Sequence, residues 1–155
     1  MTHGRATSPA ATLRRGVDLS PTDSIRLSVP AASAAVRIAR AAAAGLATRA
    51  GFTYHEVEQI QLAVGEAAAL LAPDPEGDGT LTVTFDVEAA ALAVAIELTE
   101  PGRTSPVTAS QAGRAAVPAI AAAVLDAAAD EWRVERDGLR IVLRKDLAEP
   151  DADDD

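Results

Sequence analysis

The chain has 155 residues, 48% of them hydrophobic but only 3% aromatic, with no cysteine and a formal net charge of −9. This length suits one domain with its own core, and the lack of cysteine excludes disulfides and zinc–thiolate sites. The acidic charge does not indicate nucleic-acid binding. The sequence also lacks the run of roughly 18 apolar residues that a membrane helix needs. We therefore expect a cytoplasmic protein that binds neither nucleic acid nor membrane.

The two ends of the chain differ in composition from the middle. Residues 1–23 mix small, polar and basic side chains without periodicity, and we expect a disordered segment there. Residues 148–155 are predicted to be a disordered acidic tail. The single folded domain is therefore expected over residues 24–147.

The domain begins with a strand and a helix. Ile25 to Val29 alternate apolar and polar side chains, which predicts a half-buried strand that ends at Pro30. A helix should follow from a cap at Ser33 to about Arg49. On a helical wheel its apolar face would consist of Ala35, Ile38, Ala39, Ala42, Ala43 and Leu46.

Two basic side chains of this first helix, Arg37 and Arg40, should project from its other side. The simplest interpretation is a helix that lies on a sheet with both arginines in water.

A second helix has the stronger start signal. Thr53 and Glu56 have the spacing of a capping box, which gives Glu56 a structural role, and the helix should run to about Leu71. The predicted main apolar stripe is Val57, Ile60, Val64, Ala68 and Leu71. A second apolar surface, made of Leu62, Ala63, Ala69 and Leu70, contains the isolated carboxylate of Glu66. A helix that is apolar on two sides is packed on both, or packed on one and lining a pocket on the other.

The rest of the chain predicts two hairpins and one helix. Leu81–Val87 and Leu92–Leu98 alternate as strands joined by a short link. A helix is expected over Ala112–Ala128, with Pro118 in its first turn or at a kink. Trp132–Arg136 and Leu139–Leu143 flank Asp137-Gly138, a pair typical of two-residue hairpin turns.

The resulting order, β-α-α-β-β-α-β-β, predicts an α+β two-layer sandwich. Helices should lie on one face of a mixed, mainly antiparallel sheet. Common nucleotide-binding and hydrolase motifs are absent from the sequence. Its two histidines, His3 and His55, are too few for most metal sites.

The order of elements and two sequence segments resemble those of a known family. Ser28-Val-Pro30 precedes the arginine-bearing helix, and the run from Gly51 to Glu66 follows it. In these features the chain resembles the anti-sigma regulatory factors, small bacterial proteins with the histidine-kinase-like (GHKL, or Bergerat) ATPase fold. The resemblance covers roughly Ile25 to Leu147.

The resemblance implies an ATP site that this chain has lost. Family members that bind ATP carry a glutamate general base and, four residues later, an asparagine that holds Mg²⁺. In this chain Glu66 matches the glutamate. The asparagine position is Leu70, whose side chain cannot ligate Mg²⁺. The family's adenine-binding motif is Asp-x-Gly-x-Gly. Here Leu98 replaces the aspartate, Glu100 replaces the first glycine, and only Gly102 remains. The phosphate-covering loop has at most a trace in Gln111–Arg114.

By this resemblance we expect no cofactor and a function in protein–protein binding. The expected partner is a sigma factor or an anti-anti-sigma protein with a STAS domain, contacted by Arg40 and Arg37. The alternative is an active, ATP- and Mg²⁺-dependent serine-protein kinase with Glu66 as its base. A third reading is a pseudo-enzyme paired with a nucleotide-binding homologue, and a homo- or heterodimer is compatible with each.

Overall fold

The computed structural model describes residues 22–72, 75–76, 78–100 and 117–148. In chain order its elements are β1 (Thr22–Pro30), α1 (Ser33–Ala50), α2 (Tyr54–Leu71), β2 (Thr80–Glu88), β3 (Ala91–Thr99), α3 (Ala119–Ala128), β4 (Glu131–Glu135), a 3-10 turn (Arg136–Gly138) and β5 (Arg140–Asp146). The predicted order of helices and strands is thus confirmed.

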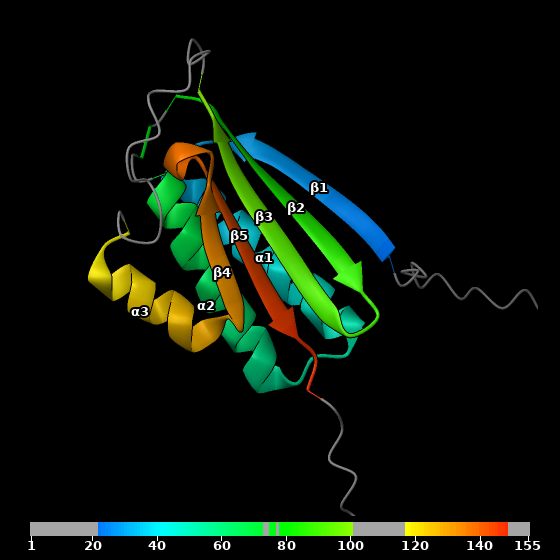
Figure 1. The fold of residues 1–155 in the computed structure, drawn as a ribbon. Helices are drawn as coiled ribbons and strands as arrows, with labels where there is room; N and C mark the ends of the chain where they lie inside the picture. Colours follow the sequence, from blue (N-terminus) through cyan, green and yellow to red (C-terminus); the bar gives the residue numbers. More distant parts are fainter. Residues whose placement is uncertain (1–21, 73–74, 77, 101–116, 149–155) are drawn as a thin grey trace, which may run out of the picture.

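The five strands form one sheet in the order β1-β2-β3-β5-β4. All four pairings between the described strands are antiparallel, so the expectation of a mixed sheet is wrong. Helices α1, α2 and α3 lie together on one face of this sheet, and no described helix covers the other face, which we call the open face (Figure 1). The architecture is a two-layer α+β sandwich, as predicted.

Strand alternation separates the two faces. On β2 the side chains of Leu81, Val83 and Phe85 are fully buried toward the helices, whereas Thr82 and Thr84 lie on the open face. β1 is an edge strand, so the missing amide hydrogen of Pro30 breaks no ladder in the interior of the sheet.

The first helix packs through a stripe of alanines. Its buried residues are Ala35, Ala39, Ala43 and Ala47, spaced one turn apart. Ile38, which we placed on the packed face, is 49% exposed. Side chains this small let the backbone of α1 lie close to its neighbours, and the larger Ile38 stays at the edge of that contact.

The start of α1 also differs from the prediction. The N-cap is Ala32, with no side-chain hydrogen bond, and Ser33 is already the first helical residue. The end of the helix is conventional, because Gly51 takes a left-handed φ of 94° and its amide bonds back to the last turn.

The second helix begins as predicted. The Thr53 side chain accepts from the Glu56 amide, and the Glu56 carboxylate accepts from the Thr53 amide, which completes the capping box. The whole predicted main stripe is buried. The second surface divides: Ala63 is buried, whereas Leu62 is 49% exposed.

Two connections near the C-terminus correct the prediction. The described third helix starts at Ala119 with Pro118 as its N-cap, and residues 112–116 lie outside the described part of the chain. Between β4 and β5 there is no two-residue turn. Glu135 pairs with Arg140, and a 3-10 turn fills the gap with Arg136 at φ 51° and Gly138 at φ 89°.

Within the described ranges, no helix combines the length and the apolar character that crossing a bilayer requires.

Candidate functional site

Glu66 lies in the middle of α2 and is partly buried. It makes no hydrogen bond or ion pair with any residue that the structure describes. A general base needs a defined orientation toward the proton it takes. The described surroundings of Glu66 provide no such orientation.

The two positions matched to the family's magnesium and adenine ligands are apolar and structural. Leu70, four residues after Glu66, and Leu98, near the end of β3, are both partly buried and pack against the hydrophobic core. The Leu98 amide also donates to the Leu139 carbonyl, at 2.9 Å. The other matched positions, Gly102 and residues 111–114, lie outside the described residues.

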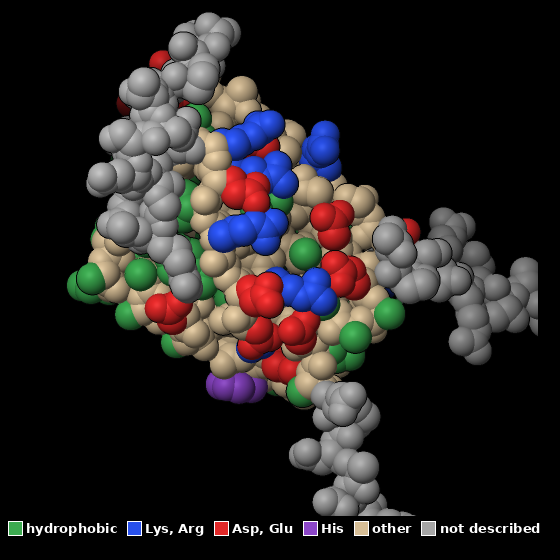
Figure 2. All heavy atoms as spheres, viewed as in Figure 1, with side chains coloured by type: hydrophobic (Ala, Val, Ile, Leu, Met, Phe, Trp, Pro, Cys, Tyr) green, Lys and Arg blue, Asp and Glu red, His purple; other side chains and the backbone are tan. Residues whose placement is uncertain are grey.

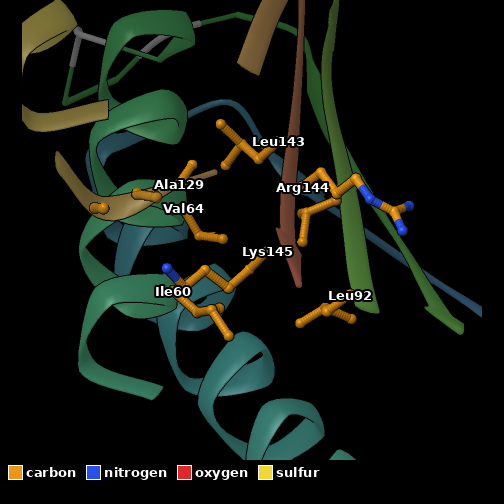
Figure 3. Close-up of a pocket in the computed structure, with 10 residues that line it drawn as sticks. Ile60, Val64, Leu92, Ala129, Leu143, Arg144 and Lys145 are labelled. Atoms are coloured by element: carbon orange, nitrogen blue, oxygen red, sulfur yellow. The ribbon is translucent and has the colours of Figure 1, made fainter. Parts of the chain in front are cut away.

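The cavity between α2 and the sheet is very small. A cavity of about 10 Å³ lies among Ile60 and Val64 of α2, Leu92 of β3 and Leu143 of β5 (Figure 3). This volume holds about one water molecule. The Lys145 side chain reaches across toward α2, and Arg144 points away to the open face (Figure 3).

The two candidate arginines lie on the surface formed by α1 and α2. Arg40 is exposed overall, yet its aliphatic stem crosses α2 at Gly65. A Cβ atom built on Gly65 would lie 2.8 Å from the Arg40 Cδ and 3.2 Å from its Cγ. The absence of a side chain at Gly65 therefore creates the seat in which Arg40 lies.

We call the group Arg37, Arg40, Leu62 and Gly65 the α1–α2 surface. Arg37 lies one turn before Arg40 on α1, and Leu62 one turn before Gly65 on α2, so each pair is adjacent. Neither arginine has a hydrogen bond or ion pair with a described residue. The α1–α2 surface thus carries two arginines and one exposed apolar side chain, Leu62.

The buried acid of α2 is Glu56, which is only 8% exposed. Its carboxylate accepts from the Thr53 amide at 2.7 Å, the Thr53 hydroxyl at 2.8 Å and the Ala148 amide at 3.1 Å. Burial raises the pKa of Glu56, but these hydrogen bonds and the nearby Lys145 outweigh it and hold the pKa below its ordinary value. Glu56 ties the start of α2 to the chain after β5, so the predicted structural role is confirmed.

The histidines add no visible site. His55 is exposed in the first turn of α2, and His3 lies outside the described residues. No three His, Asp or Glu side chains gather into a metal-binding group within the described ranges.

Comparison with known proteins does not assign a family: no family model matches this chain, and no curated protein sequence matches it.

Sequence reasoning identified Arg40 and Glu66 but missed Gly65. A glycine within a helix costs stability relative to alanine, so its presence there calls for a packing reason. The signal was an interior glycine next to Glu66, and only the packing of α1 on α2 shows that Arg40 uses the space.

Proposed function

We propose that this chain is an anti-sigma-factor-like regulator that acts by binding a protein partner and does not use ATP. In this proposal the two-layer sandwich is a histidine-kinase-like (Bergerat) fold in a bacterial cytoplasmic protein. The partner is a sigma factor or a STAS-domain anti-anti-sigma protein. The observation that carries the proposal is the seating of Arg40 over Gly65 on the α1–α2 surface.

The α1–α2 surface suits an acidic partner. The Gly65 seat restricts the stem of Arg40, which reduces the side-chain entropy lost when its guanidinium binds a carboxylate. Arg37 adds a second charge without a described partner, and Leu62 supplies an apolar contact. Arginine is one of the residue types enriched among those that dominate protein interfaces.

The chemistry of the matched positions on α2 and β3 supports a role without nucleotide. Leu70 and Leu98 carry no oxygen to hold Mg²⁺ or adenine, and both are engaged in packing. Glu66 has no described group that orients it. We therefore expect calorimetry with Mg·ATP and the full chain to show no heat of binding; micromolar, magnesium-dependent binding would favour the kinase alternative.

Partner capture with matched variants tests the binding function. Full-length wild type, Arg40→Ala and Arg26→Ala are each used to isolate partners from the native cell, and the recovered sigma factor or STAS protein is then titrated by calorimetry. Arg26 lies on the open face of the sheet, so its variant controls for a general loss of positive charge.

We expect Arg40→Ala to weaken the affinity by about tenfold or more, as for loss of a charged interface contact. Arg26→Ala should bind like wild type. Recovery of neither class of partner, or equal effects of the two substitutions, would contradict the proposal.

A further inference from the structure

The open face of the sheet carries a hollow that the proposed function does not use. Its volume is about 270 Å³, and its lining includes Arg26 of β1, Thr82 and Thr84 of β2, Ala95 of β3 and Arg140 of β5. Glu97 and Thr99 of β3 complete the lining. The hollow therefore lies between two arginines, with threonines around it.

The register explains why this face is hollow. One cross-strand row runs from Arg26 through Thr84 to Ala95, so short side chains follow the long one. The next row places Thr82 beside Glu97, and Glu97 beside Arg140. Side chains directly opposite on neighbouring strands lie close together, so long arginines at the sides and short residues between them leave an open space.

Most of the described arginines on this face form charge pairs. Acidic and basic side chains alternate over β3, β4 and β5 (Figure 2), where Arg133 pairs with Glu135 at 2.6 Å and Arg144 with Glu88 at 2.9 Å. Arg136 pairs with Glu97 as well. By contrast, Arg26 has no hydrogen bond or ion pair with any residue in the described ranges.

The second arginine of the hollow is only partly engaged. An Arg140 terminal nitrogen lies 3.2 Å from Glu97 Oε2, and its Nε lies 3.2 Å from Glu135 Oε2. The Nε contact lacks hydrogen-bonding geometry, and that buried nitrogen has no hydrogen-bond partner. Arg140 is therefore not locked in a bidentate pair, and its side chain is 33% exposed.

The lining as a whole is weakly positive. Arg26 and Arg140 contribute two positive charges and Glu97 one negative charge, a sum of +1 in a protein whose formal net charge is −9. Arg136 and Arg140 both pair with Glu97, which reduces its repulsion of an anion. Threonine hydroxyls both donate and accept hydrogen bonds, so they can bind either anionic oxygen atoms or hydroxyl groups.

We propose that this hollow binds a small oxyanion, a carboxylate or phosphate group, with Arg26 as its main charged contact. Thr82 and Thr84 hydrogen-bond the anion or hydroxyls attached to it, and Arg140 supports it from the opposite side. The site is separate from the α1–α2 surface, because it lies on the face of the sheet that the helices leave open.

The test uses the ¹⁵N-labelled full chain and follows backbone amide signals by NMR. The probes are inorganic phosphate and citrate, with sodium chloride at matched ionic strength as the salt control. We expect saturating shifts at Thr82, Thr84 and Ala95, with a dissociation constant of about 1 mM or tighter. Saturation by phosphate alone, citrate alone or both identifies the preferred oxyanion and supports the site.

Three variants locate the binding. Arg26→Gln should weaken the affinity about tenfold, as expected for loss of a charge-assisted contact. Thr84→Val keeps the shape and strand preference of the side chain but removes a hydroxyl, and it should weaken binding by a smaller factor. Arg49→Gln, in the last turn of α1 and outside both proposed binding surfaces, should bind like wild type.

The proposal is overturned if the shifts are linear and match those in sodium chloride. It is also overturned if Arg26→Gln and Thr84→Val both retain the wild-type affinity. Neither result depends on whether a sigma factor or STAS protein binds the α1–α2 surface.

Discussion

Gly45 and Gly65 lie inside helices, where glycine is less stable than alanine by about 0.5–1 kcal/mol. Their surroundings differ. A Cβ on Gly45 would meet nothing within 4 Å, whereas a Cβ on Gly65 would meet the Arg40 stem at 2.8 Å. At Gly65 the helix thus gives up stability and gains a defined position for one arginine.

This comparison gives a prediction that needs no partner protein. Gly45→Ala should raise the free energy of unfolding by about 0.5–1 kcal/mol. Gly65→Ala should raise it less, because the new methyl group displaces the Arg40 stem. In an Arg40→Ala background, Gly65→Ala should recover the full gain, as measured by urea unfolding. Equal gains in both backgrounds would mean that Arg40 has no energetic link to Gly65.

Glu56 gives a second residue-scale prediction, on pH dependence. Its folded-state pKa lies below the ordinary value, so its stabilising contribution is fully present above the unfolded-state pKa. That contribution is lost as the pH falls through the lower folded-state pKa. Glu56→Gln should therefore cost about 1–2 kcal/mol at pH 7 and progressively less in acid.

The measurement is urea unfolding of both proteins between neutral and acidic pH. Glu66→Gln is the control, since Glu66 is on the same helix but has no partner among the described residues. A constant difference between wild type and Glu56→Gln across that range would show that Glu56 is not linked to acid unfolding.

At the scale of elements, the sequence predicts features that depend on specific side-chain geometry better than it predicts which alanines are buried. The capping box at Thr53 and the alternation of β2 depend on local chemistry, and both were predicted from the sequence. The packed face of α1 was misplaced at Ile38 because a helix rich in alanine has few large side chains to set the phase. The buried alanine stripe of α1 is defined only by what packs on it.

The β4–β5 connection shows a further limit at this scale. Asp137-Gly138 is a strong two-residue turn signal, yet the ladder pairs Glu135 with Arg140 and leaves more residues in the turn. The register is decided by pairing along the whole hairpin, where Trp132 lies opposite Leu143. A local dipeptide signal does not contain that information.

This turn provides an element-scale prediction. Gly138 has φ 89°, a left-handed conformation that a Cβ disfavours. Gly138→Ala should lower the free energy of unfolding by about 1 kcal/mol, opposite in sign to Gly45→Ala. Both are measured by urea unfolding, with fluorescence of Trp132 on β4 as the probe. Stabilisation by Gly138→Ala would show that the turn does not hold this conformation.

At the scale of the whole molecule, the two positions that the proposed function matches to nucleotide ligands both pack against the hydrophobic core. Sequence matching could assign Leu70 and Leu98 to ligand positions only through a family resemblance. It could not show that both side chains contact the hydrophobic core, because that depends on how α2 lies against the sheet. The hollow on the open face was also beyond sequence reasoning, since it depends on the cross-strand register.

Because these leucines pack against the core, polar side chains at the same positions should destabilise the fold. Leu70→Asn should lower the free energy of unfolding by about 1–2 kcal/mol, because it exchanges a partly buried apolar side chain for a polar one. Leu98→Asp should cost about 2–3 kcal/mol, since a carboxylate at that position is harder to desolvate.

Leu62→Asn is the matched control for Leu70→Asn, because it makes the same substitution on the same helix at a side chain that is 49% exposed. It should change the free energy of unfolding by no more than about 0.5 kcal/mol. Chemical unfolding of the three variants, with Mg·ATP present and absent, measures both effects. If Leu70→Asn changed the free energy of unfolding no more than Leu62→Asn, the packing of Leu70 would not contribute to stability. Protection of the double variant Leu70→Asn/Leu98→Asp by Mg·ATP would instead mean that a nucleotide site persists and lacks only its ligands.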